Sequence, residues 1–249
     1  MLKWRILLQV LPLAGLFCLL KLWLYRLGWQ PWQFDAFTGS LFATASFVTS
    51  FVLNGTLTEY RKSEGLPSQI VNALTAIQDC NVLFAALYQE YDPRFLQQNL
   101  ITLATAIEAW LLGKSTLDEV YQQIDKVNLT YRAMGALGGG SWLHRPQAEL
   151  SKVRLYVQEI KSSRDSDFIA PAYIILLLFL CAAIIALLLI TGENMTETFI
   201  VSVFIFISFV YLFILIRDLE NPFQYDGSSS VDVDLSPLRE FCQRYGNSH

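Results

Sequence analysis

The position of the apolar runs along the chain constrains its fold more than any other feature. Residues 169–190 (IAPAYIILLLFLCAAIIALLLI) and 198–216 (TFIVSVFIFISFVYLFILI) contain no charged side chain. Each run has about the 20 residues that a helix needs to cross a hydrocarbon layer of roughly 30 Å. Two weaker runs, 6–24 and 37–53, come before a long polar stretch. The sequence therefore predicts an all-α membrane protein with four transmembrane helices and a helical bundle inserted between the second and third.

This pattern divides the chain into four parts. We expect a first transmembrane hairpin of two crossings at 1–53, a cytosolic helical domain at 54–167, a second transmembrane hairpin at 168–217 and a cytosolic C-terminal tail at 218–249. The connection between the last two runs has no Lys or Arg, whereas the N-terminus, the central stretch and the tail carry basic residues. Because cytoplasmic segments are enriched in Lys and Arg, both termini and the central domain are expected in the cytosol.

Composition excludes several classes of function. Of 249 residues, 53% are hydrophobic and the net charge is −4, so the sequence has no basic surface for nucleic acid. There are only two histidines, and the sequence contains no metal-ligand cluster, phosphate-binding loop or nucleophile motif. We therefore expect a protein that is not an enzyme and that needs no cofactor.

The central stretch contains recognisable helix signals. Asp92-Pro93 pairs an N-cap residue with a proline at the first helical position, and Thr116 to Glu119 matches a capping box. Residues 65–68 (GLPS) are expected to break the chain after the second crossing. Four apolar residues at alternating spacings of three and four indicate a helix pair or a subunit contact: Leu150, Val153, Val157 and Ile160.

The second crossing is the least apolar of the four, and two explanations compete for it. In one, small residues allow close helix packing while hydroxyls bond to their own backbone or across the interface. In the other, one face lines a water-filled path, with small polar groups followed by an aromatic constriction. The residues that would form this face are Ser40, Ala43, Thr44, Phe47 and Phe51.

Two charged residues border the expected outer hairpin. Asp35 lies at the start of the second crossing, where it either caps the helix or pairs with Lys21 or Arg26. Lys21 is expected to extend toward the membrane interface, beside a cluster of tryptophans and tyrosines.

The exit from the last crossing carries a short motif. Glu220-Asn221-Pro222-Phe223 is followed by an acidic, apolar segment that contains Asp226, Asp232 and Asp234. Together with the order of the crossings, this motif resembles the bestrophin family, in particular its bacterial bestrophin-like members. The resemblance covers the architecture broadly and about 30 residues by motif.

The resemblance implies a homopentameric anion channel in a bacterial-type inner (plasma) membrane, conducting small anions such as chloride. The second helices would surround the pore, and Phe47 and Phe51 would match the family's hydrophobic neck, with Ala43 as a weaker third member. In animal members the acidic stretch helps to bind calcium, which makes Asp226, Asp232 and Asp234 candidate metal ligands; solvated carboxylates are the alternative.

A second class of function fits the same sequence. A membrane-anchored helical interaction or sensor protein without conductance would also need apolar anchors and a soluble helical domain. The hydroxyls of the second crossing discriminate between the two classes, because an inert anchor has no need of polar groups there.

Overall fold

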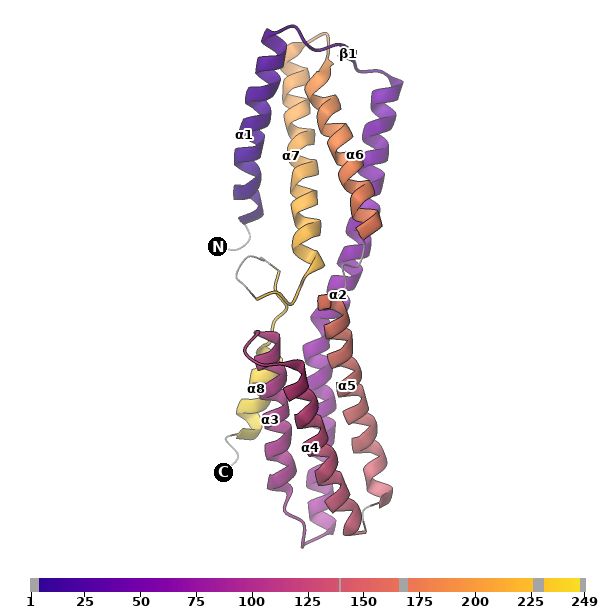
Figure 1. Ribbon diagram of the computed structural model, residues 1–249, viewed down its shortest axis with the longest axis vertical. Helices are drawn as coiled ribbons and strands as arrows, with labels where there is room; N and C mark the ends of the chain where they lie inside the picture. Colours follow the sequence, from indigo (N-terminus) through magenta and orange to yellow (C-terminus); the bar gives the residue numbers. More distant parts are fainter. Residues whose placement is uncertain (1–4, 139, 166–169, 226–230, 247–249) are drawn as a thin grey trace. The chain divides into compact units, whose positions relative to one another are not determined.

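The computed structural model describes residues 5–138, 140–165, 170–225 and 231–246. Within these ranges the protein is all-α apart from two strands of two residues each. The elements in chain order are α1 (Arg5–Arg26), β1 (Trp32–Gln33), α2 (Ala36–Leu87), α3 (Pro93–Leu111), α4 (Leu117–Ala136), the 3₁₀ helix η2 (Gly140–Leu143), α5 (His144–Asp165), α6 (Ala170–Leu189), β2 (Ile190–Thr191), α7 (Met195–Glu220) and α8 (Ser236–Gly246) (Figure 1).

The chain forms two compact units. The apolar unit contains α1, β1, the first part of α2 up to Tyr60, α6, β2 and α7. The bundle unit contains α2 from Arg61 onward, α3, α4, α5 and α8, together with the segment that begins at Pro222.

Side chains of α1 and α7 form one core of the apolar unit. Phe17 stacks on Phe206 with the ring centroids 4.2 Å apart. The strands β1 and β2 pair in parallel at one end of this unit, with Trp32 opposite Ile190. The buried residues that α1 contributes recur at helical spacing: Ile6, Val10, Ala14 and Phe17. They pack with Leu187 of α6 and with Phe206 and Val210 of α7.

Three helices of the described chain, Ile6–Arg26, Ala36–Leu87 and Met195–Glu220, are long and apolar enough to cross a membrane. A shorter apolar helical stretch, Tyr173–Leu189, lies in α6. The last two predicted crossings thus correspond to α6 and α7. The chain is an integral membrane protein by these criteria.

The expected break at residues 65–68 is wrong, because α2 continues from Ala36 to Leu87 with Pro67 inside it. A proline within a helix removes one backbone hydrogen bond and costs about 3 kcal/mol. Leu66 and Ile70, on either side of Pro67, are buried in the core of the bundle unit. Burial of this face therefore offsets the local cost, which the sequence pattern alone does not show.

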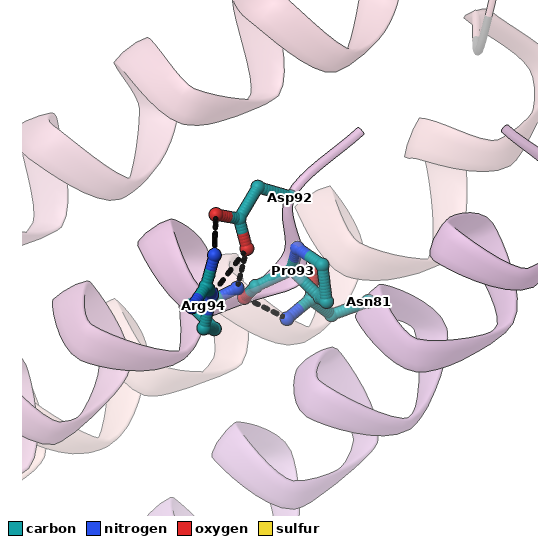
Figure 2. Close-up of polar contacts among 4 residues, drawn as sticks. All are labelled: Asn81, Asp92, Pro93 and Arg94. Carbon is teal, nitrogen blue, oxygen red and sulfur yellow. Dashed lines mark hydrogen bonds and ion pairs between the residues drawn. The ribbon is translucent and has the colours of Figure 1, made fainter. Parts of the chain in front are cut away.

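The other helix signals of the bundle unit are confirmed. Asp92 caps α3, accepting the backbone N–H of Arg94 at 3.0 Å and its guanidinium, as Figure 2 shows. Thr116 caps α4. The apolar stripe of α5, which suggested a helix pair or a subunit contact, is buried inside the bundle unit.

Asn81 is the centre of a buried polar network at the turn between α2 and α3. This side chain is 0% exposed. Its amide nitrogen donates to Pro93 O at 2.8 Å (Figure 2). The same nitrogen donates to Gln78 Oε1 at 3.1 Å. Its amide oxygen accepts the Tyr91 hydroxyl at 2.7 Å. Burial raises the pKa of Tyr91 to about 12, so this phenol remains a hydrogen-bond donor.

The network continues to the C-terminal helix. Gln78 donates to Gln97 Oε1 at 3.1 Å, and Gln97 donates to Tyr245 O at 2.7 Å. Arg239 of α8 also pairs with Glu108 of α3. The turn between α2 and α3 and the end of α8 are therefore joined by one chain of hydrogen bonds.

Replacing Asn81 by Leu should lower the free energy of unfolding by about 3 kcal/mol, because Tyr91 and Pro93 lose their buried partner. The matched control is Asn128→Leu on the exposed side of α4, which should change it by less than about 0.5 kcal/mol. Chemical unfolding of the full-length protein in detergent measures both. Equal midpoints for the two variants would contradict a stabilising role for the network.

Candidate functional site

The first part of α2 has two opposite faces. Ala45, Thr49, Val52 and Thr56 are buried. With successive residues about 100° apart, the opposite face contains the five residues singled out from the sequence. Each of them is exposed in the single chain, and Phe47 and Phe51 are each 72% exposed. The residues of this exposed face are Ser40, Ala43, Thr44, Phe47 and Phe51.

The buried face of α2 packs against α6 and α7 through small side chains. Ala45 and Ala183 are 1% and 0% exposed and share a core cluster with Leu180 and Phe209. Further along α2, Val52 packs with two buried residues of α6 and α7, Leu176 and Ile216. This packing fixes which face of α2 remains exposed.

The hydroxyls on both faces of α2 bond to their own helix. Thr49 and Thr56 donate to Ala45 O and Val52 O on the buried face. On the exposed face Thr44 donates to Ser40 O at 2.8 Å, and Ser40 to Phe37 O at 2.8 Å. Back-bonding therefore explains how these hydroxyls are satisfied, and it directs oxygen lone pairs, not protons, toward the exposed side.

Asp35 is a helix cap. It accepts the backbone N–H of Thr38 at 2.8 Å, and Thr38 Oγ1 accepts the backbone N–H of Asp35 at 2.9 Å. The hydrogen bonds from Thr38 lower the pKa of the Asp35 carboxyl. Of the two interpretations of this residue, capping is confirmed. No ion pair joins it to Lys21 or Arg26 in the part of the chain described here.

Lys21 is buried within its own chain, with 3% of the residue exposed, and its extension toward the membrane interface stays a prediction. Its ammonium donates to Leu187 O at 2.5 Å and to Ile190 O at 3.4 Å, near the end of α6. The sequence held no signal for this contact, because the acceptors are backbone carbonyls more than 160 residues away.

The motif after the last crossing ends α7 and anchors the tail. Glu220 is the last residue of α7, and Asn221 is its C-cap. In the bundle unit, Phe223 is 0% exposed in the hydrophobic core, and Pro222 O accepts the backbone N–H of Val233 at 2.9 Å. Tyr225 donates its hydroxyl to Val233 O at 2.7 Å. The Pro-Phe pair thus contributes to packing within this unit.

The candidate metal ligands are not assembled into a metal site within the described residues. Asp226 lies outside them. Asp234 accepts hydrogen bonds from the backbone N–H and the hydroxyl of Ser236 at the start of α8, and these bonds lower its pKa. Among the residues described, no group of three or more His, Cys, Asp or Glu side chains could hold a metal ion. A site that also uses Asp226 and Asp232 stays a prediction.

These features define an all-α integral membrane protein in which one helix exposes a face without charged side chains. The sequence matches no family model and no curated protein. Its fold matches a bacterial bestrophin homologue from Klebsiella pneumoniae with a TM-score of 0.66 at 17% identity, covering 98% of this chain and 96% of that chain.

Two single-substitution variants of a bestrophin homologue from the same organism give similar agreement. One has a TM-score of 0.69 at 16% identity and covers 99% of both chains. The other has a TM-score of 0.72 at 15% identity and covers 97% of this chain and 95% of that chain. The chain therefore has a bestrophin-like fold along almost its whole length.

A pair of substitutions distinguishes the buried face of α2 from its exposed face by their effects on stability. Ala45→Leu should lower the free energy of unfolding by about 1–3 kcal/mol, because the larger side chain overpacks the contact with Ala183 and Phe209. Ala43→Leu, two residues away on the exposed face, should change it by less than about 0.5 kcal/mol. Thermal unfolding of the detergent-solubilised protein distinguishes them. If Ala43→Leu were the more harmful, the assignment of the two faces would be reversed.

Proposed function

We propose that this protein is a bestrophin-like anion channel, assembled as a homopentamer in a lipid bilayer. The observation that carries the proposal is the uncharged, exposed face of α2, which the rest of its own chain leaves uncovered. In an assembly around an axis, this face would line the pore. The bestrophin-like fold supports this assignment of α2.

The chemistry of this face suits the passage of a small anion such as chloride. Closed symmetry turns a single residue into a ring, so Phe47 and Phe51 would each form an aromatic ring of side chains. The edges of phenylalanine rings carry partial positive charge, which tolerates a weakly hydrated anion. No charged residue lies between Thr38 and Asn54, so the constriction would control flow by excluding water. Ser40, Ala43 and Thr44 would form the wider part beside it.

The proposed topology has four crossings. In addition to the three long apolar helices, α6 has 20 residues and would be about 30 Å long. The segment between α6 and α7 contains Glu193 and no basic residue, and Glu197 follows in the first turn of α7, which favours placement of this end outside the cytosol. Both termini and the bundle unit would then be cytosolic, and a bacterial-type inner membrane fits this arrangement.

An alternative function and a calcium site are two further proposals. A membrane-anchored interaction or sensor protein is the alternative function, and the back-bonded hydroxyls of α2 are compatible with it. Calcium binding by the acidic tail is a separate proposal, with Asp232 and Asp234 as its described ligands.

Assembly and conductance decide between channel and anchor. The solubilised protein should have the mass of five chains, and its reconstitution into planar bilayers should give current under a chloride gradient. A monomer without current would favour the anchor.

Removing either phenylalanine should widen or deregulate the constriction. Phe47→Ala and Phe51→Ala are expected to raise single-channel conductance or open probability at least several-fold, because a dry aromatic ring is lost. Phe204→Ala is the matched control, since Phe204 is equally exposed, at 71%, but belongs to α7. Currents unchanged in both α2 variants would remove these residues from the constriction.

A further inference from the structure

A small cavity lies beside the buried Lys21 at the end of the apolar unit that contains β1 and β2. Its volume is about 10 Å³, roughly the space that one water-sized sphere occupies. Five of its lining side chains can donate hydrogen bonds: Lys21, Tyr25, Gln30, Thr191 and Thr198, of which the Thr198 hydroxyl already donates to Asn194 O. No carboxylate lines it, and the nearby acidic residues, Glu193 before α7 and Glu197 in the first turn of α7, are exposed.

Lys21 is a buried cation that lacks a counter-charge. Among the described residues no carboxylate lies within ion-pair distance of its ammonium. An ammonium has three N–H donors. The two carbonyl contacts, at 2.5 and 3.4 Å, supply partial charges near the end of α6 but no neutralising anion. Buried charges are normally paired, because an unpaired one is costly to keep out of water.

The start of α7 adds a second positive element. Met195, the first residue of α7, and Thr198 in its first turn also line the cavity. The N-terminus of a helix carries a partial positive charge and favours a nearby anion. The cavity therefore combines a full positive charge, a helix N-terminus and neutral donors in a space for one small particle.

We infer that this cavity binds a single small monovalent anion of halide size, held by the Lys21 ammonium together with Gln30 and Thr191. The site lies within one chain, so it does not depend on the channel proposed above. A protein that bound the anion but did not conduct would refute the channel and leave this site intact.

Thermal unfolding of the full-length protein in lipid-free detergent tests the inference. Sodium bromide replaces sodium gluconate stepwise at constant ionic strength, and the midpoint should rise with bromide concentration because the ligand binds only the folded state. Lys21→Met, which removes the charge but keeps an unbranched side chain, should abolish this rise. Arg26→Gln removes an exposed cation from the same end of α1 and should retain it.

A milder variant covers the case in which Lys21→Met does not fold. Thr191→Val keeps the shape of the side chain and should raise the half-saturating bromide concentration several-fold. In crystals soaked in bromide, an anomalous peak is expected within hydrogen-bond distance of Lys21 Nζ.

Three results would overturn the inference. One is a midpoint that does not depend on bromide, which would mean that water fills the cavity. The second is the same bromide dependence in wild-type protein and Lys21→Met, which would mean a general salt effect. The third is stabilisation by short-chain phosphatidylglycerol but not by bromide, which would assign the site to a lipid phosphate.

Discussion

The side-chain packing of α2 against α6 and α7 is the interaction on which the candidate site depends. Ala45 is buried in one core cluster with Ala183, Leu180 and Phe209. Since every backbone polar group in a bilayer must be bonded internally, each segment there is helical, and only its side chains can differ between faces. The packing of Ala45 and Val52 against α6 and α7 therefore leaves the opposite face of α2 exposed. The opposite face, with Phe47 and Phe51, is available to a pore only because of that packing.

The composition of α2 suggests that its hydroxyls line a water-filled path, whereas the structure shows hydroxyls bonded to their own helix. Thr44 on the exposed face and Thr49 on the buried face both donate to carbonyls of their own helix, so a hydroxyl does not by itself indicate contact with water. The exposure of this face and the bestrophin-like fold therefore support a pore more than the polarity of α2 does. A passing anion would meet aromatic edges and oxygen lone pairs, of which only the edges attract it.

Buried polar groups organise both units, in opposite ways. In the bundle unit Asn81 is matched by the Tyr91 hydroxyl, the Gln78 amide and the Pro93 carbonyl, so the network is neutral and satisfied. In the apolar unit Lys21 carries a full charge and meets two carbonyls and no carboxylate among the described residues. The Asn81 network is accounted for by its structural role. The arrangement around Lys21 leaves a charge for which a bound anion is the natural partner.

Much of the architecture followed from the sequence because its causes are local. Apolar runs of membrane length, the Asp92-Pro93 start and the Thr116 cap act within a few residues, and the structure has helices at each of them. The grouping of Ser40, Ala43, Thr44, Phe47 and Phe51 on one face also followed, since helical geometry alone fixes it. Three features required tertiary structure: the passage of α2 through Pro67, the capture of Lys21 by carbonyls of a distant helix, and the exposure of the α2 face. Each depends on the free energy of contacts between segments far apart in the chain, which no local pattern encodes.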